Sequence, residues 1–547
     1  MQLKQNVGFN NSYCIKMVKK HHFISTIKMN NKIVINVDSE TKPIDLKIYS
    51  GFIEHLGNCI YNGIWTYDPV NIPLVNIPSL LGINRDGVRK DVFMAFKSIK
   101  PTVLRAFGGC YSDVYHWKDA IGPRESRKRV QNEFWGKREK LLIKGVGPDV
   151  HNQFGTEEFL AFCEEIGAEP YLNVNYGTGT PGEAADWVEY CNGSIDTKYG
   201  FLRAKNGRKK PYNVKLWGIA NEIYGFHEVG YEKNPENYAK KYIEFAKQMR
   251  EKDSTIKLIA CGWDNSEWNQ TVLKNIGEEF VDYLSIHLYL PYINPLVPRK
   301  RHPENEKCYY ALMASNHLIE NYIVDSWNDI TSIFGNDTHV RLSFDEWGLW
   351  YITKDLIKSN YNLQDGLWAA LIMQVFQKKA DVCSIANNSE MINVFGAIQT
   401  DKDGIILTPI YHAMKLFVDH MQSNYIEDIK IECARYDSKR YGRIPGRNGV
   451  PFIECCANIN DKRDSISIML INKHMRDKII VSIEILEFSP NKKGEEVELS
   501  SKSPFDYNTI ENREKIQITE NPFHNGKSKM NIQLKPHSIK ILKLTKK

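Results

Sequence analysis

The sequence predicts an α/β protein in two parts. These are a (β/α)8 TIM barrel over residues 46–420 and an all-β, jelly-roll-like sandwich over residues 421–547. Three observations carry this prediction. The chain has 547 residues, which is too long for one average domain. Short apolar runs alternate with amphipathic helical stretches up to about residue 400. After about residue 420 the apolar residues alternate with period two, as in antiparallel strands.

The first part contains repeated strand and helix signals. Apolar runs that predict strands lie at residues 102–105, 170–175, 214–219, 257–262, 283–287 and 340–345. A helix is predicted over residues 156–166, with Thr156 as its N-cap and Gly167 just beyond its end, and a second helix begins at Pro235. Repeated units of this kind favour a parallel sheet with helical crossovers, and the length favours a closed barrel. No GxGxxG follows an early strand, so a dinucleotide-binding fold lacks its fingerprint.

The remaining segments complete the predicted organisation. Strands of the sandwich are predicted at residues 465–472, 479–486 and 538–544. Residues 29–45 contain a further strand pattern, which we expect to join this sandwich from the other end of the chain. Residues 1–28 are predicted to be a disordered extension.

Composition excludes several classes of partner. The net charge is only +6, from 72 basic and 66 acidic residues, so a nucleic-acid partner is not expected. No apolar run is long enough to span a membrane, and the N-terminus lacks the apolar core of a signal peptide. The 11 cysteines include no CxxC motif, which favours free thiols in a reducing compartment over disulfides or zinc. We therefore expect a cytoplasmic protein.

Two glutamates follow strand patterns in positions suited to catalysis. Glu222 comes directly after Asn221 at the end of one apolar run, and Glu346 follows another run, just before Trp347. Taken alone, either glutamate could cap a helix or pair with a basic residue. Together they match strand ends four and seven of a barrel, whose carboxyl ends converge on one face. Glycoside hydrolysis needs one protonated and one ionised carboxyl group across the scissile bond, and indole rings suit the C–H faces of a sugar.

Several ordered segments strengthen this interpretation. They include Phe52-Ile-Glu-His-Leu-Gly, Leu104-Arg-Ala-Phe-Gly-Gly, Asn173-Val-Asn-Tyr-Gly, Trp217-Gly-Ile-Ala-Asn-Glu and Asp282-Tyr-Leu-Ser-Ile-His. Together they resemble the α-L-arabinofuranosidases of glycoside hydrolase family 51, and the resemblance runs from about residue 45 to the C-terminus. It implies a retaining enzyme that removes terminal non-reducing α-L-arabinofuranosyl groups from arabinan or arabinoxylan oligosaccharides. It also implies no metal or other cofactor, and a possible homo-hexamer.

The resemblance also assigns roles. Glu222 is expected to be the acid/base and Glu346 the nucleophile. The substrate-binding residues that the resemblance implies are Glu54, Arg105, Asn221, His287, Tyr289, Trp350 and Glu390. Among them, Tyr289 is expected to hydrogen-bond the nucleophile with His287 beside it, and Trp350 to form an apolar wall. Glu390 stands where the family usually supplies a sugar-binding glutamine.

Two alternatives remain open from the sequence. An endoglucanase or a β-xylosidase could use the same scaffold, because the shape of the pocket decides the sugar that is accepted. A non-catalytic carbohydrate-binding protein is also conceivable, although the presence of both glutamates argues against it. A panel of nitrophenyl glycosides would separate these functions.

Overall fold

The computed structural model describes residues 31–67, 72–82, 86–136, 149–292, 303–351 and 361–547. The extension predicted over residues 1–28 lies outside the described residues. A search of the described helices finds none with the length and apolar character needed to cross a membrane.

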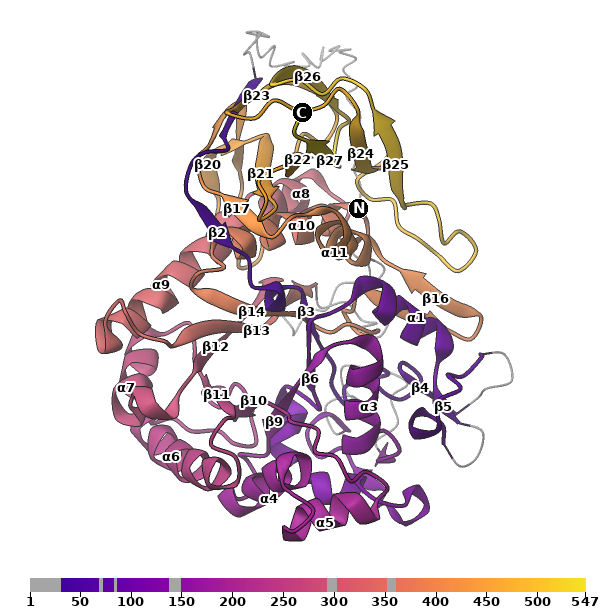
Figure 1. Ribbon diagram of the computed structural model, residues 1–547, viewed down its shortest axis with the longest axis vertical. Coiled ribbons are helices and arrows are strands. Elements are labelled where there is room, and N and C mark those ends of the chain that lie inside the picture. The colour runs from indigo at the N-terminus through magenta and orange to yellow at the C-terminus, as the bar shows by residue number, and fades with distance from the viewer. Residues whose placement is uncertain (1–30, 68–71, 83–85, 137–148, 293–302, 352–360) are drawn as a thin grey trace, which may run out of the picture.

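Eight parallel strands close into a barrel, with helices packed around it (Figure 1). In chain order the strands are β3 (Ser50–Phe52), β6 (Val103–Ala106), β9 (Glu169–Val174), β10 (Leu216–Ile219), β11 (Lys257–Cys261), β12 (Tyr283–Pro291), β13 (Arg341–Trp350) and β14 (Cys383–Asn388). The outer helices include α1 (Lys90–Ile99), α3 (Thr156–Ile166), α4 (Pro181–Asn192), α6 (Pro235–Lys252), α7 (Ser266–Ile276), α9 (Asn316–Phe334) and α10 (Leu363–Lys378). The ring closes where β14 pairs with β3. The predicted fold class is confirmed.

The two helices predicted in detail begin close to their expected positions. Helix α6 begins at Pro235, and the side chain of Asn234 accepts hydrogen bonds from the next backbone amides. Helix α3 spans Thr156–Ile166, but its N-cap is Gly155 and not Thr156. The reason is a competing tertiary contact. The hydroxyl of Thr156 accepts a hydrogen bond from the indole of Trp187, while the Glu158 carboxylate caps the amide of Gly155.

The second part consists of two sheets packed face to face, one antiparallel and one mixed. One has the order β18-β1-β23-β26 and the other β2-β17-β21-β22-β27-β24-β25. Strand β1 (Asn31–Asn36) pairs antiparallel with β18 (Ile429–Glu432) and parallel with β23 (Ile479–Leu486). The other strands are β2 (Thr41–Pro43), β17 (Asn424–Ile426), β21 (Ile453–Ile459), β22 (Ser465–Asn472), β24 (Gly494–Leu499), β25 (Ile518–Phe523), β26 (Lys529–Leu534) and β27 (Ser538–Thr545). The first described strand thus lies beside strands from the end of the chain (Figure 1).

The core of the sandwich explains the period-two pattern. Ile33 and Ile35 of β1, Val481 and Ile483 of β23, and Leu542 of β27 are all fully buried in one cluster between the sheets. Alternate residues of a strand point to the same face, so this pattern buries one face of each sheet. Helices α10 and α11 (Pro409–His420) lie between the sandwich and the barrel (Figure 1).

The strands that carry the candidate site are longer and less regular than predicted. Strand β13 continues through Glu346 to Trp350, and its pairing with β14 is irregular between Phe344 and Trp347. The pairing of β12 with β13 is irregular between Ser285 and His287, after which His287 lies opposite Glu346. Such bulges change the direction of side chains at barrel rims. Glu346 therefore lies within a strand instead of after its end.

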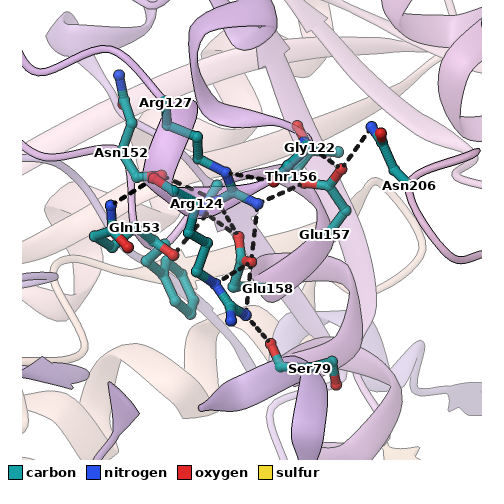
Figure 2. A network of polar contacts seen from close by, with 12 residues as sticks. Ser79, Gly122, Arg124, Arg127, Asn152, Gln153, Thr156, Glu157, Glu158 and Asn206 are labelled. Carbon is teal, nitrogen blue, oxygen red and sulfur yellow. Dashed lines mark hydrogen bonds and ion pairs between the residues drawn. The ribbon is translucent and has the colours of Figure 1, made fainter. Parts of the chain in front are cut away.

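The long loop after β6 is held by a buried ionic network (Figure 2). The guanidinium of Arg127 lies 2.7 Å from the Glu158 carboxylate and 3.2 Å from that of Glu157. Arg124 adds a contact of 2.9 Å to Glu158. Ion pairs that are this deeply buried hold their partners in one arrangement, because a charge left unpaired there is costly. The network connects this loop to the start of helix α3.

Candidate active site

Glu346 is held by hydrogen bonds from two other strands of the barrel. Arg105, on β6, donates from Nη1 to Oε1 at 2.7 Å, and Tyr289, on β12, donates its hydroxyl to Oε2 at 2.6 Å. Glu346 is only 6% exposed and Arg105 only 1%. The two hydrogen bonds thus fix the orientation of the Glu346 carboxyl group.

Glycine at position 109 leaves room beside Glu346. A Cβ atom on Gly109 would lie 2.9 Å from Oε1 of Glu346 and 3.2 Å from the ring of Phe52. Any side chain there would displace the carboxylate or the ring. The same ring lies 5.0 Å from the guanidinium carbon of Arg105. The close approach of this loop therefore depends on glycine.

Glu222 is presented by a strained turn after β10. The backbone φ angles are 78° at Ala220 and 45° at Glu222. Residues other than glycine rarely adopt this left-handed region. His287 Nδ1 lies 2.9 Å from Oε1 of Glu222 and 3.8 Å from Oε2 of Glu346. The nearest ligand atoms of these three residues all lie within 4.8 Å of one another. The turn thus brings the second carboxyl group against the first, with an imidazole beside both.

The pKa values of Glu222 and His287 are shifted in opposite directions. Burial raises the pKa of Glu222, but the hydrogen bond and charge of His287 outweigh it and hold the pKa below its ordinary value. Burial lowers the pKa of His287, whereas the charges of Glu346 and Glu222 raise it above the ordinary value. Both shifts favour the charged forms of Glu222 and His287, which face each other across the hydrogen bond between Nδ1 and Oε1.

Glu54 and Asn221 lie against the same cluster. The carboxylate of Glu54 accepts from the amide of Tyr111 at 2.7 Å and from the indole of Trp135 at 3.1 Å. Burial, followed by the charge of Glu346, raises the pKa of Glu54 to about 8. Asn221 accepts from Nη2 of Arg105 at 2.6 Å. Both residues are buried at the carboxyl ends of the barrel strands.

Trp350 and Glu390 occupy different environments. The Trp350 ring lies 5.6 Å from the rings of both Tyr289 and Phe395, so it packs behind the tyrosine that holds Glu346. Glu390 follows β14 and is fully buried. Burial, then the charge of Glu54, raises its pKa well above the ordinary value. Trp350 is therefore part of an aromatic cluster beside Tyr289, and Glu390 adds a carboxyl group that resists ionisation.

Three contributors were missed by the sequence analysis. Trp135 donates to Glu54 from the loop after β6, and Tyr171 on β9 donates to Asp345 at 2.8 Å. Glu228, six residues after Glu222, is 5% exposed and points back at it. Only the position of Glu228 soon after a catalytic strand could have indicated it from the sequence. The two hydrogen bonds join residues 81 and 174 positions apart, a separation that no local pattern reports.

Two groups of side chains have the spacing of a possible cation site. Cys110, Glu222 and Glu228 form one, and Glu222, His287 and Glu346 form the other. In the second group the potential ligand atoms are already bonded, through His287 to Glu222 and Tyr289 to Glu346. In the first, His227 lies 3.0 Å from Glu228. We therefore assign neither group to a metal and interpret both as acid–base clusters.

An eight-stranded barrel with two closely spaced, differently partnered carboxyl groups at its carboxyl-terminal rim defines the protein as a glycoside hydrolase. Family models agree with this class. Residues 95–294 match the α-L-arabinofuranosidase 1 domain, and residues 345–538 match the α-L-arabinofuranosidase C-terminal domain.

Comparisons with individual proteins identify the family. The chain is 34% identical to α-L-arabinofuranosidase C of Emericella nidulans, over 81% of this chain and 84% of that protein. It is 31% identical to an intracellular exo-α-L-arabinofuranosidase of Bacteroides ovatus, over 94% and 95%. The structure of the family 51 enzyme of Thermotoga petrophila has a TM-score of 0.82 and 33% identity, covering 94% of this chain and 99% of that one. The chain belongs to glycoside hydrolase family 51, the α-L-arabinofuranosidases.

Proposed function

We propose that this enzyme removes terminal non-reducing α-L-arabinofuranosyl groups from arabinan and arabinoxylan oligosaccharides by double displacement, with Glu346 as nucleophile and Glu222 as acid/base. The observation that carries the proposal is the pair of carboxyl groups. Their nearest oxygens lie within 4.8 Å, one held by Arg105 and Tyr289 and the other by His287. Retaining enzymes place their carboxyl groups about 5–5.5 Å apart, which leaves no room for a directly attacking water.

In the first step Glu222 gives its proton to the departing glycosidic oxygen while Glu346 attacks the anomeric carbon. Each oxygen of Glu346 accepts one hydrogen bond in the described structure and keeps a second lone pair for attack. In the second step Glu222 takes a proton from water, and that water displaces Glu346 from the sugar. His287 Nδ1 is hydrogen-bonded to Oε1 of Glu222, and this contact keeps the acid/base oriented in both steps.

The remaining residues are proposed to bind the sugar. Glu54 and Asn221 would accept and donate hydrogen bonds to furanose hydroxyls, and Arg105 would support both Asn221 and Glu346. Trp350 would close one side of the glycon site. An arabinose complex of the Thermotoga maritima relative, 33% identical with a TM-score of 0.82, supports an arabinose-containing substrate. The hexamer implied by the family resemblance remains part of the proposal, and light scattering would test it.

We also propose that the enzyme works in the cytoplasm on imported oligosaccharides. The Bacteroides ovatus relative, which is described as intracellular, supports this location. The ten cysteines in the described part of the chain are all free, and nine of them are buried. Free thiols are typical of a reducing compartment. Cell fractionation of the native host would test the location.

The stereochemical course tests the mechanism directly. Because no water fits between the two carboxyl groups, the first product should keep the anomeric configuration of the substrate. Proton NMR of the first turnovers of 4-nitrophenyl α-L-arabinofuranoside should show the α-anomer before mutarotation. Early appearance of the β-anomer would exclude double displacement. A panel of nitrophenyl arabinofuranoside, xyloside and glucoside substrates tests the sugar preference in parallel.

Glu390 provides a prediction about pH. Burial, followed by the charges of Glu54 and Glu346, holds the pKa of Glu390 well above its ordinary value, so it should be protonated near neutral pH. A protonated carboxyl group can donate one hydrogen bond to the sugar. As the pH rises, Glu390 loses this proton and adds a negative charge to the site. Replacing it by glutamine removes that titration, so the alkaline limb of kcat/KM should move to higher pH, with equal or better turnover.

The pH–rate profile of an arabinofuranoside substrate measures this effect. Glu165→Gln makes the same change on the exposed surface of α3 and should leave the profile unchanged. If Glu390→Gln also leaves the alkaline limb in place, Glu390 does not line the sugar site.

A further inference from the structure

A cavity of about 190 Å³ lies outside the candidate active site. Its walls come from the segment 55–62 after β3, from Tyr67, from Asn132 and from residues 149–151. The described lining includes none of the residues proposed to bind or cleave the arabinofuranosyl group. Sites for drug-sized ligands have volumes of roughly 300–1,000 Å³. This smaller cavity therefore has room for one small ring.

Four polar atoms on the cavity walls have no hydrogen-bond partner among the described residues. They are both ring nitrogens of His55, Oδ1 of Asn58 and the hydroxyl oxygen of Tyr67. His55 is only 5% exposed, so solvent does not satisfy its nitrogens. Buried polar groups in native proteins are nearly always hydrogen-bonded, because an unpaired one is costly. Four such atoms at one cavity indicate that an occupant completes their bonds.

These four atoms are uncharged and include both donors and acceptors. Burial lowers the pKa of His55 to about 3, so near neutral pH its imidazole carries one N–H donor and one bare acceptor nitrogen. Burial also raises the pKa of Tyr67, so its hydroxyl stays neutral and can donate or accept. Oδ1 of Asn58 accepts. This set matches a molecule whose hydroxyl groups both donate and accept hydrogen bonds.

Aromatic rings supply the apolar part of the lining. The rings of Tyr61 and Tyr67 stack with their centroids 5.6 Å apart, and the ring of His151 lies 5.0 Å from that of Tyr67. The ring of His55 lies 5.6 Å from that of Tyr61. Aromatic faces of this kind pack against the C–H faces of a sugar ring. The cavity thus combines unpaired polar atoms with aromatic surfaces.

The charges on the walls argue against an anion or a metal ion. No lysine or arginine belongs to the described lining, so a buried anion would have no counter-charge. Asp149, a carboxylate of this lining, already pairs with Arg129 at 3.1 Å. The groups of described side chains with the spacing of a cation site contain none of the residues that line this cavity. The lining chemistry therefore fits a small neutral molecule rich in hydroxyl groups.

We propose that this cavity is a second binding site, which takes one neutral sugar of about the size of a pentose. It adjoins the loop that holds Glu54. Asn132, on the cavity wall, donates from Nδ2 to the carbonyl of His55 at 2.7 Å and accepts at Oδ1 from the amide of Trp135 at 2.7 Å. The indole of Trp135 donates to Glu54. The bound sugar is either a free pentose or one unit of an oligosaccharide.

Crystallography and calorimetry of full-length Glu346→Ala test the inference, because this variant should not hydrolyse an oligosaccharide. Crystals soaked with L-arabinose should contain a sugar in the cavity, within hydrogen-bond distance of His55 and Tyr67. Titration with L-arabinose in solution should count two sites per chain. Ordered water alone in the cavity would overturn the inference. So would binding at crystal concentration only, with a single site in solution.

Variants of the cavity wall identify the second site in solution. In the Glu346→Ala background, Tyr67→Phe keeps the ring and removes the hydroxyl, so the affinity of one of the two sites for L-arabinose should fall about fivefold. Asn58→Ala removes another unpaired atom and serves if Tyr67→Phe does not fold. Tyr507→Phe makes the same change beside Lys515 in the second part of the chain, and should leave both affinities unchanged. Unchanged affinities in both cavity variants would contradict the proposal, whereas a role in folding alone would alter only thermal unfolding.

Arabinotriose distinguishes the two sources of the sugar. If the cavity holds a unit of a bound oligosaccharide, Tyr67→Phe should also weaken the binding of arabinotriose. If it holds a free pentose, arabinotriose should fill only the cleavage site, and the cavity should still bind L-arabinose. Either result supports a second sugar site. The proposed function would fail separately, if the unmodified enzyme did not hydrolyse arabinofuranosides.

Discussion

Replacing Glu346 with alanine is expected to lower kcat/KM on the order of 10⁵-fold for every arabinofuranoside, whatever its leaving group. The covalent intermediate needs a carboxylate at this position. Here that carboxylate is oriented by Arg105 and Tyr289, so no neighbouring group can replace it. Steady-state kinetics with 4-nitrophenyl α-L-arabinofuranoside measure the loss. Circular dichroism and thermal unfolding show whether the variant is folded.

External azide should distinguish loss of the nucleophile from damage to the site. Alanine at position 346 leaves space for a small anion beside Arg105, and azide should attack the sugar there directly. The product should be the inverted β-L-arabinofuranosyl azide, identified by NMR. If azide restores activity with the α-configuration, Glu346 is not the nucleophile.

Replacing Glu222 with alanine should have an effect that depends on the leaving group. General acid catalysis contributes roughly 10²–10⁴-fold, so kcat/KM for oligosaccharides should fall by about this factor. For a 2,4-dinitrophenyl arabinofuranoside the first step needs little protonation, and kcat/KM should change by less than about tenfold. The second step still lacks its base, so the arabinosyl-enzyme should accumulate. Mass spectrometry of the intact protein would detect the added sugar.

The same azide experiment provides a matched control. In Glu222→Ala the nucleophile is intact, so azide should intercept the arabinosyl-enzyme and give an azide of retained α-configuration. Opposite configurations from the two variants would assign both roles in one experiment. Equal losses on good and poor leaving groups would contradict the role of Glu222 as the acid.

The fold class and the candidate carboxyl pair followed from local patterns in the sequence. Period-two and helical patterns identify elements because burial repeats with the geometry of each element. Glu222 and Glu346 were visible because each lies at the end of an apolar run, and parallel strands bring such ends together. The position of a helix cap was predicted wrongly. Thr156 was expected to be a cap, but its hydroxyl bonds Trp187 across the structure.

What only the tertiary structure decided is how the site's charges are partnered. The bond from Arg105 to Glu346 spans 241 residues, and that from Tyr289 to Glu346 spans 57. The register of β12 against β13, with its irregularity at His287, places the imidazole between the two carboxyl groups. The loop after β10 turns Glu228 inward, and the segment after β14 buries Glu390. Sequence patterns report which face of an element is apolar, but hydrogen bonds and charge interactions depend on distances between elements, which only packing and register determine.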